Sequence, residues 1–207
     1  MKPRNPRIVV FLIIVFTLFT AFTVYSFTQE IKTPKLPYLG QVLPFELINQ
    51  EGNSFGLAQL KNKVWIADFF FTTCGDICPL LTKNMASLSR SFEKVPHVEF
   101  VSISVNPEYD SPETLAKYSA GISKGKDNWS FLTGPREKIT DLVIKSFKLG
   151  DIKDPVFHSS SLALVDKNGY IRGYYDGTNQ EEVNKLFKDS AVLAKEKNYH
   201  GFRSPGN

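Results

Sequence analysis

Cysteine is scarce in this chain, with only two among 207 residues. Neither lies directly after the apolar N-terminal segment, so nothing indicates a lipid-anchored lipoprotein. Internal repeats and low-complexity segments are also absent from the sequence. Because Cys74 and Cys78 stand alone, their relationship to each other decides which thiol or metal chemistry is open to the protein.

The chain also lacks the excess of basic residues that a nucleic-acid-binding protein would carry. Its formal net charge is +4, but Lys2, Arg4 and Arg7 all precede the first acidic residue, Glu30. Without these three, 22 basic residues face 21 acidic ones, and the two kinds are interleaved along the sequence. A basic face or stripe is therefore not expected, and we predict no binding to nucleic acid.

Charge is missing altogether from Ile8 to Gln29. The apolar run Ile8–Phe27 would span roughly 30 Å as a helix, which is the hydrocarbon thickness of a bilayer. The basic flank favours a cytoplasmic N-terminus and places the rest of the chain on the periplasmic side of the cell membrane. A cleavable signal peptide, with small residues at Val24 and Ser26, is the alternative. Its apolar region usually runs only about 7 to 15 residues, so we predict an uncleaved single-pass anchor.

The remaining chain is long enough for one folded domain. Apolar residues make up 42% of the sequence and charged residues 22%, which is ordinary for a globular protein. We predict a membrane anchor with a short cytoplasmic N-terminus at residues 1–27 and a proline-containing linker at 28–43. A single domain at 44–198 and a flexible tail at 199–207 complete the predicted organisation.

Apolar patterning within the domain alternates between strands and helices. Val64–Phe71 is apolar almost throughout, as in a central strand covered on both faces. The other predicted strands are Phe45–Ile48, Ser54–Leu57, Val98–Val105, Trp129–Leu132, Ser161–Val165 and Tyr170–Tyr174. The predicted helices begin near Pro79, Ser111, Pro135 and Asn179 and end near Phe92, Gly121, Phe147 and Lys197. This alternation predicts an α/β sandwich with a mixed central sheet.

Cys74 and Cys78 lie where the central strand leads into the first helix of the domain. Free backbone amides and the positive end of the helix dipole would lower the thiol pKa there and favour the thiolate. In a near-helical segment the two Cα atoms would be roughly 6 Å apart, a distance that a disulfide accepts. A purely structural disulfide is disfavoured, because closing a loop of about five residues stabilises little. A redox pair and a two-thiolate metal site both remain open from the spacing alone.

His158 favours the metal site over the redox pair. It lies in the loop directly before the predicted strand Ser161–Val165, where it could face the edge of the sheet. A lone loop histidine is usually an ordinary surface residue, and His97 and His200 fit that description. Two thiolates with one imidazole would make a three-coordinate soft site suited to Cu(I). Zinc would need a fourth ligand, and none is evident.

The sequence resembles the Sco/SenC family of copper-binding proteins over roughly Pro44–Phe187. Cys74-Gly75-Asp76-Ile77-Cys78-Pro79, which follows a phenylalanine-rich strand, matches the family's C-x-x-x-C-P motif. His158 matches the family's copper-ligand histidine. Residues 104–113 are similar to the family's D-P-x-x-D-[TS]-P-E loop, with Asn106 in place of the usual aspartate. That departure removes a charge near the loop but no ligand.

The resemblance implies a thioredoxin-like sandwich on a membrane-anchored copper chaperone. The implied ligands of one copper ion, as Cu(I) or Cu(II), are Cys74, Cys78 and His158, and the cysteine pair would also cycle between dithiol and disulfide. The implied partner is the subunit that carries the CuA centre of cytochrome c oxidase. The chain would deliver copper to that subunit or prepare its thiols. On this interpretation the protein is a monomeric metallochaperone rather than an enzyme.

Two alternatives use the same residues. An extracytoplasmic thiol-disulfide oxidoreductase would need Cys74 and Cys78, although a thioredoxin-like reductase is expected to have two residues, not three, between its cysteines. A non-enzymatic copper or redox sensor would signal through the loop that carries His158. A peroxiredoxin is excluded, because its P-x-x-x-T-x-x-C signature would need proline at Ala67 and threonine at Phe71.

Overall fold

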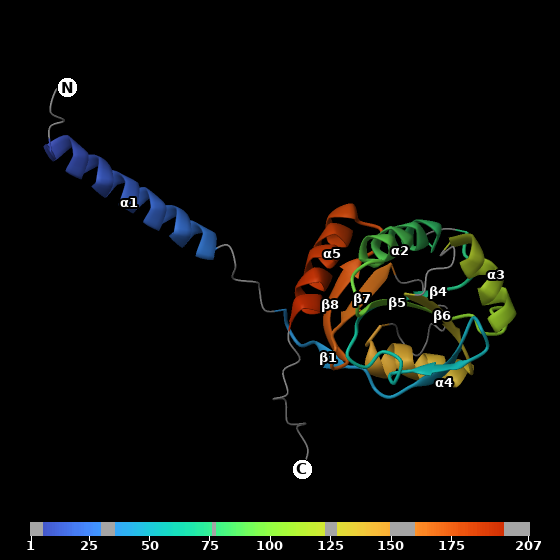
Figure 1. The fold of residues 1–207 in the computed structure, drawn as a ribbon. Helices are drawn as coiled ribbons and strands as arrows, with labels where there is room; N and C mark the ends of the chain where they lie inside the picture. Colours follow the sequence, from blue (N-terminus) through green and yellow to red (C-terminus); the bar gives the residue numbers. More distant parts are fainter. Residues whose placement is uncertain (1–5, 30–35, 76–77, 123–127, 150–159, 197–207) are drawn as a thin grey trace, which may run out of the picture. The chain divides into compact units, whose positions relative to one another are not determined.

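The computed structural model describes residues 6–29, 36–75, 78–122, 128–149 and 160–196 (Figure 1). The chain divides into two units, one ending at Lys35 and the other starting at Leu36. The described part of the first unit is a single helix, α1 (Pro6–Gln29). The second unit holds the sheet and the helices that pack on it.

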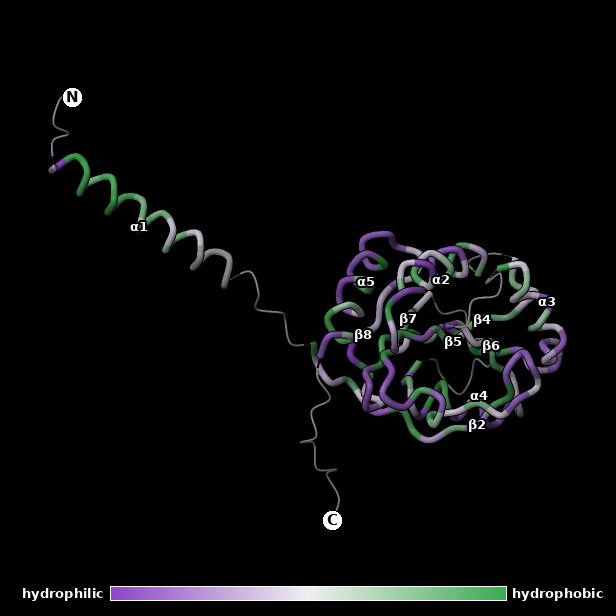
Figure 2. Tube along the Cα trace, viewed as in Figure 1, coloured by the Kyte–Doolittle hydropathy of each residue, from purple (hydrophilic) through white to green (hydrophobic). Residues whose placement is uncertain are grey.

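Helix α1 has the length and composition of a membrane-spanning segment. Its large apolar side chains are exposed, and the hydrophobic colouring is strongest over its first turns (Figure 2). The hydroxyls of Thr17, Thr20 and Thr23 each donate to the carbonyl three residues earlier, at 2.9, 3.0 and 2.9 Å. These hydroxyls are therefore satisfied without water. Pro6–Thr23 is long and apolar enough to cross a bilayer, a property that a signal sequence shares.

The second unit is built on a mixed sheet of eight strands in the order β1-β8-β7-β4-β5-β6-β2-β3. Strands β4, β5 and β6 are parallel, and all other neighbours are antiparallel. Every residue of β4 is buried, which confirms the predicted central strand. The strands are β1 (Gly40–Gln41), β2 (Glu46–Asn49), β3 (Ser54–Gly56), β4 (Val64–Phe70), β5 (Val98–Ser104), β6 (Trp129–Thr133), β7 (Ser161–Val165) and β8 (Tyr170–Asp176).

Helices cover both faces of this sheet (Figure 1). On one face lie α2 (Cys78–Phe92), α3 (Pro112–Ile122) and α5 (Gln180–Lys195), and on the other lie α4 (Arg136–Asp141) and the π-helical turn η1 (Leu142–Ser146). Alternate residues of β4 point to opposite faces, so Ile66 and Phe70 join one core cluster while Trp65 and Phe69 join the other. The predicted α/β sandwich with a mixed central sheet is confirmed.

The folded unit begins at Leu36, eight residues before the predicted boundary at Pro44. Strand β1 pairs with β8, and the Arg172 guanidinium donates to the carbonyls of Leu36 and Pro37 at 2.7 and 2.9 Å. The same guanidinium lies 4.0 Å from the centre of the Tyr38 ring. The second half of the predicted 28–43 linker is therefore part of the domain. Its proline-rich composition indicated a spacer, because the partners that hold it are more than 130 residues away in sequence.

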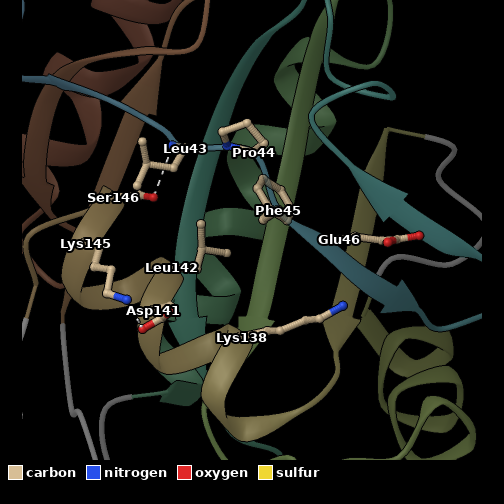
Figure 3. Close-up of a pocket in the computed structure, with 9 residues that line it drawn as sticks. All are labelled: Leu43, Pro44, Phe45, Glu46, Lys138, Asp141, Leu142, Lys145 and Ser146. Atoms are coloured by element: carbon tan, nitrogen blue, oxygen red, sulfur yellow. Dashed lines mark hydrogen bonds and ion pairs between the residues drawn. The ribbon is translucent and has the colours of Figure 1, made fainter.

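The helix predicted to end near Phe147 is regular only in its first half and continues as η1. A π-helical turn accommodates one extra residue, and here Ser146 is buried and its Oγ accepts the Leu43 amide at 3.1 Å. Leu43, Pro44 and Phe45 line one wall of a groove of about 440 Å³ over α4 and η1 (Figure 3). Neither cysteine is among its lining residues. The groove therefore lies between the start of β2 and the helices α4 and η1, and it is separate from the thiols.

Candidate metal centre

The two cysteines lie where the sequence predicted, between the end of β4 and the start of α2. After β4 the chain makes a turn that is closed by the Cys74 amide, which donates to the Phe71 carbonyl at 3.2 Å. Helix α2 begins at Cys78, with Pro79 in its first turn, where a missing amide proton costs nothing. Asp76 and Ile77 of the motif lie outside the described residues.

Both cysteines are free thiols, and they lie next to each other. Cys78 is 5% exposed and belongs to the core cluster under α2, whereas Cys74 is half-buried and packs against the same cluster. Their side chains are joined by a hydrogen bond. The structure therefore brings together the two soft donors that the spacing predicted.

The acidity of Cys78 differs from the sequence-based expectation. The pKa of the Cys78 thiol is raised to about 12, mainly by burial; the hydrogen bond to Cys74 adds to this rise, and a backbone hydrogen bond from Phe71 opposes it. The prediction of a lowered thiol pKa is thus wrong for Cys78, because removal from water outweighs the helix terminus. Cys78 carries its proton at neutral pH, and binding a metal or forming a disulfide has to release that proton.

A buried carboxyl group, Asp68, is a neighbour of the thiols that the sequence did not reveal. It lies in β4, is 1% exposed and accepts a hydrogen bond from Ser102 Oγ at 2.5 Å; that Oγ in turn accepts from Trp129 Nε1 at 2.9 Å. Among the residues that the structure describes, no cation pairs with it. Burial raises the pKa of Asp68 from 3.8 to about 7, and the charge of Asp68 in turn raises the pKa of Cys78.

Tyr118 of α3 is a second neighbour that sequence patterning missed. Its ring stacks on Phe70 with the ring centres 5.3 Å apart, and its hydroxyl is 3.1 Å from Thr82 Oγ1 of α2. Burial raises the pKa of Tyr118, and the charges of Asp68 and both cysteines raise it further. Both Asp68 and Tyr118 belong to elements that were predicted, but only the tertiary packing places them near the thiols.

The third predicted ligand, His158, lies outside the described residues. Within the described ranges, no group of three histidine, cysteine, aspartate or glutamate side chains is arranged to hold a metal ion. The strand that follows His158 in the sequence is β7, which is antiparallel to β4 and pairs Ala163 with Ala67. Ser161 at the start of β7 therefore lies at the sheet edge where β4 ends and the cysteine turn begins.

Comparison with known proteins adds to this geometry. The model of the SCO1/SenC family matches residues 39–191. The chain belongs to the SCO1/SenC family. The SCO1 protein homolog of Bacillus subtilis (strain 168) is 38% identical over 167 residues, which cover 78% of this chain and 85% of that protein. The resemblance seen in the cysteine motif is thus confirmed over most of the domain.

Solved structures of SCO1/SenC proteins share the fold. BsSco, a member of the Sco family of cytochrome c oxidase assembly proteins in which a disulfide switch was identified, is 36% identical. It matches with a TM-score of 0.69 over 78% of this chain and 98% of that one. Arabidopsis thaliana ScoI, solved with copper bound, is 25% identical with a TM-score of 0.62 over 75% and 97% of the two chains. The thioredoxin-like class of the domain is confirmed.

Proposed function

We propose that this SCO1/SenC protein is a membrane-anchored copper chaperone that binds one copper ion through Cys74, Cys78 and His158. It would deliver that ion to the CuA centre of cytochrome c oxidase. The observation that carries the proposal is the pair of free, hydrogen-bonded thiols at the start of α2. The copper-bound relative and the oxidase assembly role named for BsSco support it.

The donor set fits copper as a cargo. Thiolates are soft ligands that select Cu(I), and one imidazole would complete a three-coordinate site. The half-buried Cys74 provides access from solvent, while the buried Cys78 keeps the second sulfur in apolar surroundings. Each bound thiol has to give up its proton, so loading the site releases protons.

Thiol reduction is the second candidate, and the hydrogen bond between the two cysteines favours it. Closing the pair to a disulfide removes two electrons and two protons and abolishes both thiolate ligands. Copper binding and disulfide formation are therefore mutually exclusive at this site. Reduction needs Cys74 and Cys78 but has no stoichiometric need for His158, whereas copper transfer needs all three residues.

Substitution of His158 in cells separates the two functions. We expect His158→Ala to lower the CuA content and activity of the oxidase, because a two-sulfur site holds copper more weakly. Added copper should partly restore the activity of His158→Ala cells, and should restore Cys74→Ser or Cys78→Ser cells less well. The measurement is oxidase activity and copper content in membranes at two copper concentrations.

His97→Ala is the matched control, because His97 belongs to the same domain and lies directly before β5, beside the start of β4, whereas the cysteines follow the end of β4. It should leave oxidase activity unchanged. Normal oxidase assembly in His158→Ala cells, with failure in both cysteine variants, would make thiol reduction the primary function. The full-length protein should also bind one Cu(I) per chain, and an affinity unchanged from the wild type in all three ligand variants would end the copper proposal.

The anchor is the second part of the proposal, with the domain on the periplasmic side of the cell membrane. It is supported by the exposed apolar surface of α1 and by hydroxyls that need no water, and Lys2, Arg4 and Arg7 support a cytoplasmic N-terminus.

Fractionation tests whether α1 stays on the mature protein. The full chain should remain with membranes after carbonate washing, because about 18 apolar residues are enough to span the hydrocarbon core. A truncated chain starting at Glu30 should be recovered in the soluble fraction. A native protein shortened near Ser26 and found in the soluble fraction would show that the segment is a cleaved signal peptide.

A further inference from the structure

A buried aspartate outside the ligand set holds the turn that carries Cys74. Asp110 lies between β5 and α3 and is fully buried. Its Oδ2 accepts the Thr72 amide at 3.1 Å, its Oδ1 accepts the Thr72 hydroxyl, and its Oδ2 also accepts Ser104 Oγ at 2.5 Å. The carboxyl group therefore ties the residue two positions before Cys74 to the neighbouring strand β5.

The same group is itself held rigidly. The Asp110 amide donates to the Asn106 carbonyl at 3.1 Å, and the Asn106 amide donates to Ser104 Oγ at 3.1 Å. Ser104 is the last residue of β5 and is buried. The acceptor for Thr72 is thus fixed to the parallel sheet and not to a loose loop. A ligand-bearing turn supported from a rigid element keeps its donor atom in place.

We propose that Asp110 is a positioning residue that, through Thr72, holds Cys74 in the geometry that binds copper and opposes closure of the disulfide. This inference rests on the proposed copper site. Thr72 is the second residue of the turn closed between Phe71 and Cys74, so the clamp acts on the backbone of that turn. Cys78 is fixed separately by its burial at the start of α2.

The clamp has opposite effects on the two chemistries of the pair. A disulfide needs the two sulfurs about 2.05 Å apart, much closer than sulfurs joined by a hydrogen bond. Because Cys78 is fixed in the core, Cys74 has to move to close that gap, and the clamp resists the movement. Copper binding instead benefits from a Cys74 that is already in place, because less freedom is lost on binding.

The experiment compares Thr72→Val and Thr72→Ser in the full-length protein in detergent. Valine removes the hydroxyl donor and keeps the shape, whereas serine keeps both donors. Thr72→Val should weaken Cu(I) binding about tenfold, the loss expected for one hydrogen bond to a carboxylate. It should also shift the dithiol/disulfide equilibrium about tenfold toward the disulfide, which is a potential about 30 mV more negative. Thr72→Ser should restore both values.

Affinity is measured by competition with a Cu(I) chelator, and the potential by equilibration with reduced and oxidised dithiothreitol without metal. Asn49→Ala is the matched control: Asn49 is also buried, and its Oδ1 holds the β2–β3 turn by accepting the Glu51 and Asn53 amides at 3.1 and 2.8 Å. It should leave both readouts unchanged. Asp110→Asn, which keeps the volume but loses one acceptor oxygen, should shift both in the direction of Thr72→Val.

Wild-type affinity and potential in Thr72→Val would overturn the clamp, as would equal shifts in Asn49→Ala. If Thr72→Val does not fold, Asp110→Asn decides by the same two readouts. The potential is measured without copper, so it tests the clamp even if the wild-type protein binds no Cu(I). A wild-type protein that binds no Cu(I) would end the proposed function, and the clamp would then be tested by the disulfide equilibrium alone.

Discussion

Replacing Asp68 by asparagine should raise the free energy of unfolding above pH 7 by on the order of 4 kcal/mol. Asp68 is fully buried with no cation beside it among the described residues, and burial raises its pKa from 3.8 to about 7. Asparagine keeps the acceptor oxygen for Ser102 and cannot ionise. The substitution therefore removes the cost of placing a charge inside the sheet and keeps the hydrogen bond.

The sign follows from which state binds the proton. Between about pH 4 and pH 7 the folded protein keeps the Asp68 proton while the unfolded chain has lost it, so the stability that protonated Asp68 contributes is lost as pH rises. The wild type should lose about 1.4 kcal/mol per pH unit relative to Asp68→Asn across this window. Below about pH 4 the two proteins should be equally stable.

Urea unfolding of the full chain in detergent, followed by the fluorescence of Trp65 and Trp129, measures this difference at a series of pH values. Asp176→Asn is a control of opposite sign, because hydrogen bonds from Thr178 lower the pKa of Asp176. It should cost stability at neutral pH and make no difference in acid. A parallel pH dependence of the wild type and Asp68→Asn would show that Asp68 is not the buried proton site.

Arg172→Met should lower the free energy of unfolding by about 3–5 kcal/mol, the cost of leaving a buried charge without its partner. Arg172 and Asp166 are joined at 2.9 Å, with side chains only 3% and 7% exposed. The substitution leaves the buried Asp166 carboxylate without its cation. It also removes the donor to the carbonyls of Leu36 and Pro37. Arg172→Lys should restore little of the lost stability, because an ammonium group cannot donate to all three acceptors of the planar guanidinium, which are the Asp166 carboxylate and the carbonyls of Leu36 and Pro37.

The same urea measurement, with Asp166→Asn added to Arg172→Met, isolates the charge. The double variant should be more stable than Arg172→Met alone, since no carboxylate is then buried without a partner. Lys145→Met is the control for an exposed pair, because Lys145 and Asp141 are about 60% exposed and their ion pair contributes little. A loss in Arg172→Met no larger than in Lys145→Met would contradict the prediction.

The sequence predicted most of the domain because apolar periodicity is a local property. Strand β7 was predicted with its observed bounds, and the hairpin β2–β3, the central strand and α5 to within a few residues. Strand β1 was missed because Gly40 and Gln41 have no strand pattern of their own and are strands only by pairing with β8. The π-helical turn was missed because the contact made there by Ser146, which accepts the Leu43 amide, joins residues about a hundred apart in sequence.

The positions of the two cysteines were predictable from the sequence, whereas the residues around them were not. Cys74 and Cys78 were found because their spacing and the following proline are local, whereas the role of His158 remains a prediction. Asp68 stands in an apolar run where a single polar residue does not disturb the pattern of a buried strand. The rise in the Cys78 pKa comes from burial in the core, which overrides the local effect of the helix end.

The pairing of β1 with β8 also sets an order of events during synthesis. Gly40 pairs with Ile171, so residues directly after the first unit wait for a partner made 131 residues later. At about 5–20 residues per second, that wait lasts roughly 7–26 s. During this interval Val42, which is buried in the folded domain, lacks the Gly169 carbonyl that accepts its amide. Although β1 is the first strand in sequence, it can therefore join the sheet only once β8 has been made, after β2 to β7.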